Sequence, residues 1–297
     1  MANFGKRSTA EQVTAGIDLT GKTALITGVN SGIGEETARV LSMRGAKVIG
    51  AARTLEKAET VCKNLAGETI PLACELSDPS SIATAINAIK SQNISIDMLI
   101  ANAGIMALPK LEKANGIELQ FMTNHLGHFQ LVTGLLDCLS ANARITIVSS
   151  SAHNFAPKEG IDFDNLDGSR SYSAMAAYGR SKLANVLFAN ELARRLSSKG
   201  VTANSLHPGV INTNLGRHMN KVLASVFAVT IFWMMKSVGQ GAATTCYVAA
   251  HPDVESLSGK YFDNCQEGKM NPLGRSEDLA KRLWEYSEQK VAELTAS

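Results

Sequence analysis

The stretch TALITGVNSGIG, residues 23–34, joins an apolar run typical of a strand to EETARVLSMRG, residues 35–45, which has helical spacing. A glycine-rich turn between a first strand and a helix lets the backbone approach a pyrophosphate, which the unpaired N–H groups of the helix N-terminus then bind. The spacing is G-x-x-x-G-x-G, which differs from the G-x-G-x-x-G of the standard dinucleotide fingerprint. We predict a dinucleotide site here and keep an ordinary tight turn as the alternative. Its expected residues are Gly28, Asn30, Ser31, Gly32, Ile33 and Gly34.

Beyond this turn, apolar runs that predict strands alternate with segments of helical period. Such alternation predicts an α/β fold in a single domain, a Rossmann-type doubly wound parallel sheet of about seven strands with helices on both faces. The predicted strands are residues 23–27, 47–52, 69–74, 98–101, 145–148, 201–206 and 259–262. Helices are expected from Gly32, over 54–65, from Ser77-Asp78-Pro79 onward, and over 117–139, 174–196, 238–250 and 276–294.

The composition excludes several classes of protein. Of 297 residues, 45% are hydrophobic and 19% are charged, which suits a soluble chain with a large core. The formal net charge of +2 and the scattered lysines and arginines argue against nucleic acid as a partner. The five cysteines lack CxxC spacing and are interpreted as reduced thiols, with neither a disulfide framework nor a metal site. Since the first 22 residues hold no apolar run, we expect a cytoplasmic protein with neither a signal peptide nor a membrane anchor.

Two segments stand apart from the alternation. Residues 1–20 are expected to be a poorly fixed N-terminal extension, before a domain that spans residues 21–297. Residues 210–236 are interpreted as an insertion after the sixth strand and as the place of substrate contacts. Within it, VLASVFAVTIFWMM (residues 222–235) has 14 residues and is too short to span a bilayer. A pocket lid or core segment is favoured over a helix in weak contact with a membrane.

The end of the second strand decides which dinucleotide is expected. Folds of this kind place an acidic residue there for the ribose hydroxyls of NAD, whereas an arginine accommodates the 2′-phosphate of NADP. The segment VIGAART, residues 48–54, has no acidic residue, and Arg53 can hold a phosphate through two parallel hydrogen bonds. We therefore predict NADP(H) over NAD(H). A solvent-facing arginine at the start of a helix is the alternative.

A second chemical pattern is YGRSK, residues 178–182, inside the helix expected over 174–196. Tyr178 and Lys182 are four residues apart, so both side chains leave one face of the helix. A phenol has a pKa of about 10, and a neighbouring cation lowers it, which makes the hydroxyl a usable proton donor and acceptor. Two exposed residues at chance spacing are the alternative, and the nucleotide signature upstream weakens it.

Six motifs occur in an order that resembles the short-chain dehydrogenase/reductase family over residues 20–265. They are TGVNSGIG (27–34), ANAG (101–104), NHLGHF (124–129), VSSSAH (148–153), YGRSK (178–182) and HPG (207–209). The wording of these motifs, with SGKYF near the last strand, is most similar to the retinol-dehydrogenase-like branch, which includes the WW-domain oxidoreductase. No WW module is visible in the sequence.

The resemblance implies a catalytic tetrad of Asn124, Ser150, Tyr178 and Lys182. In that scheme Tyr178 exchanges the proton with the substrate oxygen, and Ser150 donates a hydrogen bond to the same oxygen. Lys182 lowers the pKa of the tyrosine and holds the nicotinamide ribose. Asn124 holds a water molecule that links the site to solvent.

The serine of the tetrad is chosen from three consecutive candidates. Aligning VSSSAH with the family's VSSxAH selects Ser150 over Ser149 and Ser151. Ser149 is then expected to point to the other side of the strand end, because side chains alternate along a strand.

The resemblance also implies further cofactor contacts. Asn102, Ala103 and Gly104 are expected on the adenine-ribose side, and Leu76 near the adenine ring. Glu75 stands before Leu76 where most relatives have aspartate. The nicotinamide is expected to meet Pro208, Gly209, Val210 and Thr213.

The leading hypothesis is an NADP(H)-dependent oxidoreductase that transfers a hydride between the nicotinamide and the carbonyl, or primary or secondary alcohol, of a bulky hydrophobic substrate. A non-catalytic NADP(H)-binding sensor and a reductase of an activated C=C bond are the alternatives. The region of Phe155, Tyr172 and Met175 is expected to form a wall of an apolar pocket.

Two other expectations concern residues 117–139. The helices over 117–139 and 174–196 form the dimer bundle of relatives, which favours a homodimer. A monomer or membrane association, favoured by the apolar segment 222–235, is the alternative. His125 and His128 are three residues apart and resemble a zinc pair, but no third ligand is apparent, so buried core histidines are favoured.

Overall fold

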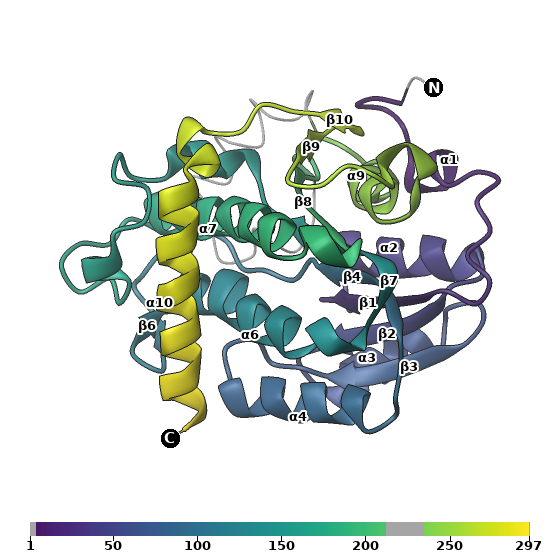
Figure 1. Ribbon diagram of the computed structural model, residues 1–297, viewed down its shortest axis with the longest axis horizontal. Helices are drawn as coiled ribbons and strands as arrows, with labels where there is room; N and C mark the ends of the chain where they lie inside the picture. The colour runs from purple at the N-terminus through teal and green to yellow at the C-terminus, as the bar shows by residue number, and fades with distance from the viewer. Residues whose placement is uncertain (1–3, 212–234, 297) are drawn as a thin grey trace.

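A computed structural model describes residues 4–211 and 235–296, and within them an eight-stranded sheet forms the centre of the molecule (Figure 1). The strand order is β10-β9-β8-β7-β4-β1-β2-β3. All neighbours from β9 to β3 are parallel, and β10 pairs antiparallel with β9. The strands are β1 (Thr23–Thr27), β2 (Lys47–Ala52), β3 (Thr69–Ala73), β4 (Ile96–Ala101), β7 (Leu139–Val148), β8 (Thr202–His207), β9 (Tyr261–Asp263) and β10 (Gln266–Glu267). The predicted doubly wound parallel sheet is confirmed, and the two-residue β10 is too short to give a periodic signal in the sequence.

Helices cover both faces of the sheet (Figure 1). One face carries α1 (Ala10–Val13), α2 (Gly32–Met43), α3 (Leu55–Cys62) and α9 (Val238–Ala250). The other carries α4 (Pro79–Lys90), α6 (Gly127–Gly134), α7 (Ala174–Arg195) and α10 (Glu277–Thr295). In β1, Ala24 and Ile26 pack with the first group and Leu25 packs with the second, as alternation along a strand requires. All five residues of β1 are therefore buried, which is typical of a central parallel strand.

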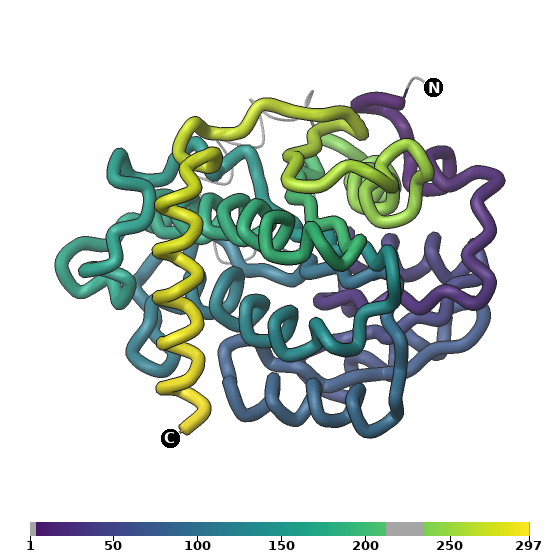
Figure 2. The backbone as a smooth tube through the Cα atoms, viewed as in Figure 1, coloured from purple at the N-terminus to yellow at the C-terminus, as the bar shows by residue number. Residues whose placement is uncertain are grey.

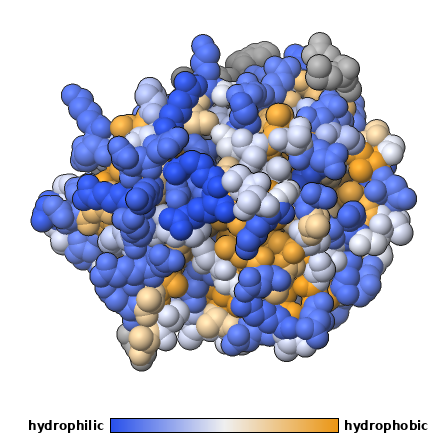
Figure 3. All heavy atoms as spheres, in the orientation of Figure 1, coloured by the Kyte–Doolittle hydropathy of each residue, from blue (hydrophilic) through white to orange (hydrophobic). Residues whose placement is uncertain are grey.

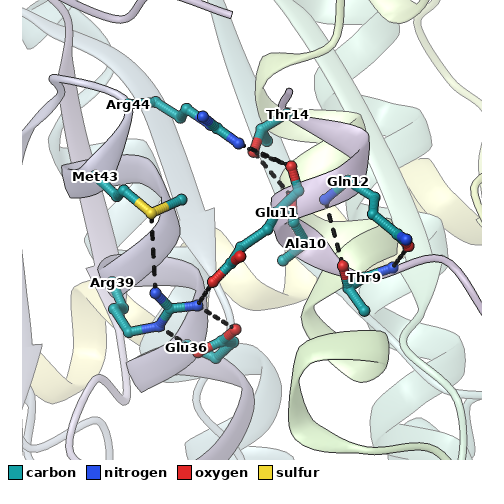
Figure 4. Close-up of polar contacts among 9 residues, drawn as sticks. All are labelled: Thr9, Ala10, Glu11, Gln12, Thr14, Glu36, Arg39, Met43 and Arg44. Atoms are coloured by element: carbon teal, nitrogen blue, oxygen red, sulfur yellow. Dashed lines mark hydrogen bonds and ion pairs between the residues drawn. The ribbon is translucent and has the colours of Figure 1, made fainter. Parts of the chain in front are cut away.

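Residues 4–20 pack against the first group of helices, so the expectation of a poorly fixed extension is wrong for them. α1 begins with a capping box and buries Ala10 and Val13. Figure 4 shows the guanidinium of Arg39 on α2 paired with the Glu11 carboxylate of α1, while Arg44 donates to the Glu11 carbonyl oxygen. A helix of four residues is too short to reveal itself by periodicity.

The single helix predicted over residues 117–139 is also wrong. The segment begins with β6 (Ile117–Glu118), which pairs with β5 (Lys113–Ala114) in a two-stranded ribbon. A short α5 (Leu119–Phe121) leads into a π-helical turn (Met122–Leu126), in which the Gly127 N–H donates to the Met122 carbonyl oxygen, and α6 follows. Every residue from 120 to 132 is buried, so no polar face in the sequence marks the change of helix type.

The C-terminal helix α10 joins α6 to α7. The ring of Trp284 lies 5.0 Å from that of Phe129 on α6 and 5.9 Å from that of Phe188 on α7, between centroids. The outer side of α10 is largely hydrophilic (Figure 3). In Figure 2, α10 at the yellow end of the colour scale and α1 at the purple end lie on opposite sides of the molecule. Because its inner side packs on Phe129 and Phe188 and its outer side is hydrophilic, α10 covers the outer side of α6 and α7.

Candidate active site

The predicted site residues gather at one edge of the sheet. The carboxyl ends of the parallel strands meet there, and the direction of winding reverses between β1 and β4, which is where ligands bind in this architecture. At six strand ends, a predicted residue follows within two positions: Gly28 after β1, Arg53 after β2, Glu75 after β3, Asn102 after β4, Ser150 after β7 and Pro208 after β8.

The turn after β1 brings the backbone close to the start of α2. Gly28 and Gly32 have φ angles of +73° and +61°, which favour glycine. A Cβ on Gly34 would lie 2.3 Å from the Gly28 carbonyl oxygen. Ser31 precedes α2 without capping it through its side chain, whereas α3, α4, α9 and α10 all begin with a side-chain cap. The first N–H groups of α2 are thus open to an anion, which fits a dinucleotide pyrophosphate. The other predicted residues of this turn, Asn30 and Ile33, are half-buried.

Arg53 lies beside this turn, because the Gly28 N–H donates to Ala51 in β2 at 2.8 Å. The Arg53 side chain is exposed and has no ion pair with another described residue. Glu75 is engaged locally, since its carboxylate accepts the N–H and hydroxyl of Ser77 at 3.1 and 2.9 Å. Leu76 is buried. Among Arg53, Glu75 and Leu76, Arg53 is therefore the residue with a charged group that no other described residue pairs with, next to the glycine turn after β1.

The segment after β4 is held at both ends by side chains. Thr27 Oγ1 accepts the N–H groups of Asn102 and Ala103 at 2.9 and 3.0 Å. At the other end, Asn124 Oδ1 accepts the Ile105 N–H at 2.8 Å, and Asn124 Nδ2 donates to the Ile105 carbonyl oxygen at 2.9 Å. The residue expected to hold a relay water thus also fixes the segment expected to line the cofactor.

The serines after β7 meet different partners. Ser149 Oγ donates to the Lys182 carbonyl oxygen in α7 at 2.7 Å. Ser150 starts a 3₁₀ turn (Ser151–Phe155), and its Oγ accepts the Ala152 N–H at 3.2 Å. The Ser150 side chain also faces Tyr178, and this polar contact opposes the rise in the pKa of the tyrosine. Ser150 is therefore the serine that meets the tyrosine, while Ser149 points to the helix backbone.

Tyr178 and Lys182 are both buried on one side of α7, with the lysine Nζ 5.8 Å from the centre of the tyrosine ring. The Nζ donates to the Val148 carbonyl oxygen at 3.1 Å, and a Cβ on Gly104 would lie 3.4 Å from it. Burial raises the pKa of Tyr178 to about 12, against the hydrogen bond with Ser150, and lowers the pKa of Lys182 to about 8. The predicted lowering of the tyrosine pKa is wrong for this structure, because the removal of the phenolate from water outweighs the contact with Ser150.

A lysine that the sequence analysis does not single out packs against the turn after β8. Lys236 is 6% exposed, and its Nζ donates to the Pro208 carbonyl oxygen at 3.2 Å. A Cβ on Gly209 would lie 2.5 Å from the Lys236 Cδ, and the Lys236 N–H donates to the Val210 carbonyl oxygen at 2.9 Å. No motif marks this contact, because its partners are far apart along the chain. Thr213 lies outside the described residues, as does the 212–234 part of the predicted insertion.

Comparison with known protein families shows to which broad class of protein this chain belongs. A family model described as short chain dehydrogenase matches residues 22–162 and 165–223. The chain belongs to the short-chain dehydrogenase family. Among curated members of the family, the short-chain dehydrogenase TIC 32 B, chloroplastic, of Brassica napus is 44% identical over 99% of this chain and 96% of its own. Human retinol dehydrogenase 14 is 39% identical over 92% of this chain and 87% of its own, and human WW domain-containing oxidoreductase is 39% identical over 98% and 73%. The predicted retinol-dehydrogenase-like branch is confirmed.

Solved structures of short-chain dehydrogenases share the fold. An uncharacterized protein from Mycobacterium paratuberculosis superposes with a TM-score of 0.77 at 32% identity, over 96% of this chain and 98% of its own. A Burkholderia cenocepacia short chain dehydrogenase in complex with NADP has a TM-score of 0.65 at 23% identity, over 82% of this chain and 96% of its own.

Within residues 4–211 and 235–296, every helix is too short or too polar to span a bilayer. No three His, Cys, Asp or Glu side chains there are placed to hold a metal ion together.

Proposed function

We propose that this short-chain dehydrogenase transfers a hydride between NADP(H) and the carbonyl, or primary or secondary alcohol, of a bulky hydrophobic substrate. One observation carries the proposal: the Ser150 and Tyr178 hydroxyls meet beside Lys182, at the sheet edge onto which the uncapped start of α2 opens. When bound, the nicotinamide supplies or accepts the hydride. The side chains of the protein then handle the proton and orient the substrate oxygen.

Tyr178 is the proposed proton donor. With its pKa raised to about 12 it is protonated at neutral pH, which is the form that donates to the oxygen of a carbonyl under reduction. Ser150 donates to the same oxygen and fixes it. Lys182, with a pKa of about 8, is mostly cationic at neutral pH and favours the phenolate that forms during the transfer.

Asn124 is the proposed holder of the relay water. Both Nδ2 hydrogens are used, one on the Ile105 carbonyl oxygen and one on Ser181 Oγ at 3.0 Å. A water molecule would therefore bind an acceptor of Asn124, and its Oδ1, which accepts the Ile105 N–H, has one further lone pair for it. From there it would pass the proton between the Lys182 region and solvent.

Arg53 supports NADP(H) over NAD(H), since it follows β2, whose Ala51 accepts the Gly28 N–H of the glycine turn. Its side chain is exposed and pairs with no described acidic residue, so it is available to a 2′-phosphate. The Arg53→Asp variant is expected to weaken NADPH binding by about tenfold to a hundredfold and to raise relative use of NADH. Steady-state kinetics with both cofactors test this. An unchanged preference would remove the argument.

The hydrophobic substrate is supported by exposed apolar side chains near the reacting groups. Phe155 is 62% exposed at the end of the turn that Ser150 begins, and Val210 is 38% exposed in the turn after β8. Tyr172 is anchored by its hydroxyl, which donates to the Leu108 carbonyl oxygen at 2.6 Å. Apolar surface of this kind beside polar reacting groups is typical of a pocket for an apolar ketone, aldehyde or alcohol.

The proposed reaction is tested by the decay of NADPH absorbance with a panel of carbonyl compounds of increasing apolar size. We expect turnover that improves with apolar bulk. NADPH binding without decay on any compound would instead favour a nucleotide sensor. A product that has lost a C=C bond, identified by mass and NMR, would favour the double-bond reductase.

The partners and location complete the proposal. A homodimer through α6 and α7 would have to include α10, which covers their outer side. Size-exclusion chromatography with light scattering, which measures the molecular mass in solution, tests the dimer. Weak membrane contact through residues 222–235 and a cytoplasmic location remain predictions, and one relative is named as chloroplastic.

A further inference from the structure

Two histidines in or next to the Asn124 turn, the π turn Met122–Leu126, point to opposite neighbours: His125 lies in the turn and His128 in the first turn of α6. His125 Nε2 is hydrogen-bonded to Ser287 Oγ on α10 at 2.9 Å. His128 Nε2 is hydrogen-bonded to Thr27 Oγ1 at the end of β1, also at 2.9 Å. Both rings are buried, at 0% and 1% exposure. The His125 ring links the Asn124 turn to α10, and the His128 ring links it to the dinucleotide turn. Because the two Nε2 atoms bond to different side chains, they are not placed to bind one metal ion together.

The hydrogen bonds around Thr27 define the tautomer of His128. Thr27 Oγ1 accepts the N–H groups of Asn102 and Ala103, which uses both of its lone pairs. Its single proton is therefore donated to His128 Nε2. The ring proton then lies on Nδ1, which donates to the Asn124 carbonyl oxygen at 3.0 Å. All donors and acceptors of this neutral ring are satisfied.

His128 thereby connects the two side chains that hold the segment after β4. Thr27 holds the start of that segment, and Asn124 holds its end at Ile105. Asn124 Nδ2 also donates to Ser181 Oγ, whose proton goes to the Tyr178 carbonyl oxygen at 2.8 Å. A network of hydrogen bonds thus extends from the end of β1, through His128 and Asn124, to the turn of α7 that carries the proposed proton donor.

We propose that His128 is a positioning residue that fixes the Asn124 turn relative to the dinucleotide turn. It acts through Thr27 and Asn124, so that the cofactor-lining segment and the proton relay keep one fixed geometry. The inference rests on the proposed function, because it assigns His128 a part in that same reaction. His125 has no part in it, since its ring bonds to α10.

The test compares His128→Phe with His125→Phe. Both substitutions keep a buried aromatic ring in or next to the Asn124 turn, but only the first breaks the link to Thr27. We expect His128→Phe to lower kcat about tenfold, to weaken NADPH binding and to change the pH profile of kcat. His125→Phe is expected to lower Tm while kcat and NADPH affinity stay within about twofold. Equal effects of the two variants on kcat would overturn the proposal.

A double-mutant cycle tests whether His128 acts through Asn124. In an Asn124→Ala background, His128→Phe should have little further effect on kcat, because the group that it positions is gone. If the fold-loss in kcat of the double variant equalled the product of the two single losses, the proposal would be contradicted.

Two further measurements separate this proposal from the proposed function. If no carbonyl is turned over, the proposed function fails, but the rise in Tm on adding NADPH still reports the link. That rise should be smaller for His128→Phe than for His125→Phe, and equal rises would overturn the positioning. If His128→Phe does not fold, His128→Gln replaces it, because the glutamine oxygen can take the place of Nε2 and accept from Thr27, whereas glutamine has no donor at the δ position that Nδ1 uses for the Asn124 carbonyl oxygen. It should retain NADPH affinity and lose kcat, and a wild-type kcat would refute the proposal.

Discussion

The sequence predicts a long helix over residues 174–196 and another over 117–139, and the two regions turn out differently. α7 is one regular helix of 22 residues, whereas the other region divides into β6, α5, a π turn and α6. On α7 the chemistry depends on local spacing, since Tyr178 and Lys182 share a face one turn apart. On the π turn Asn124 is placed by partners from other parts of the chain, at positions 105 and 181. Sites that depend on local spacing can be predicted from sequence, and sites that depend on distant hydrogen bonds cannot.

The largest expected effect belongs to the regular helix. Tyr178→Phe removes the proposed proton donor and should lower kcat by about a thousandfold or more, with NADPH affinity retained. NADPH oxidation in a stopped-flow instrument and NADPH fluorescence titration measure the two quantities. Tyr286→Phe is the matched control, because it also removes a tyrosine hydroxyl but lies on α10, where its ring packs against Phe163. Substantial turnover by Tyr178→Phe would refute the proton-donor assignment.

Local pattern accounts for most of the fold. The bounds of β1, β2 and α9 agree with the prediction. The two strands are apolar runs and the helix has helical spacing of apolar residues, and a glycine, polar or capping residue marks the ends of each. The parts that differ have weak local signals: α1 has four residues, β10 has two, and the π turn lies in a stretch that is buried on all sides.

The site divides in the same way. The order of the motifs predicts that Ser150, Tyr178 and Lys182 belong to one site, and in the structure these three residues lie together. The contacts of His128 with Thr27 and of Lys236 with Pro208 join residues 101 and 28 positions apart, and no spacing rule predicts them. The tyrosine pKa is predicted with the wrong sign, because its burial depends on the packing of the whole site.

Trp284→Ala tests the junction between the two regions. Trp284 packs on Phe129 of α6 and Phe188 of α7, so its loss should lower the free energy of unfolding by about 3 kcal/mol or more. Urea unfolding measures the change. The exposed neighbour Glu285→Ala should change it by less than about 0.5 kcal/mol. A small effect of Trp284→Ala would mean that α10 does not hold α6 and α7 together.

Lys182→Met separates function from stability on α7. Methionine keeps an unbranched side chain of similar length but removes the charge, so kcat and NADPH affinity should each fall, with kcat down about a hundredfold. Because burial disfavours the lysine ammonium, Tm should stay the same or rise. The exposed Lys199→Met is the control on the turn after α7. A variant with lower Tm and normal kcat would make Lys182 a structural residue only.

The last expected effect is a difference in acid sensitivity between the two regions. α7 holds no histidine, whereas burial lowers the pKa of His125 to about 3 and that of His128 to about 4. In the unfolded chain both have a pKa of about 6.5, so below that pH the unfolded state binds protons that the folded state excludes. The free energy of unfolding should therefore fall as pH drops from about 6.5 toward about 4, by about 1.4 kcal/mol per pH unit for each histidine.

His125→Phe isolates one of these two protons. Every other titrating group is shared with the wild type, including His207, whose pKa burial also lowers to about 4. Denaturant unfolding between about pH 7 and about pH 5 should give a shallower pH dependence for the variant, by about one proton. Parallel curves would mean that the His125 ring becomes protonated in the folded protein, which its hydrogen bond to Ser287 and its lack of exposure to water argue against.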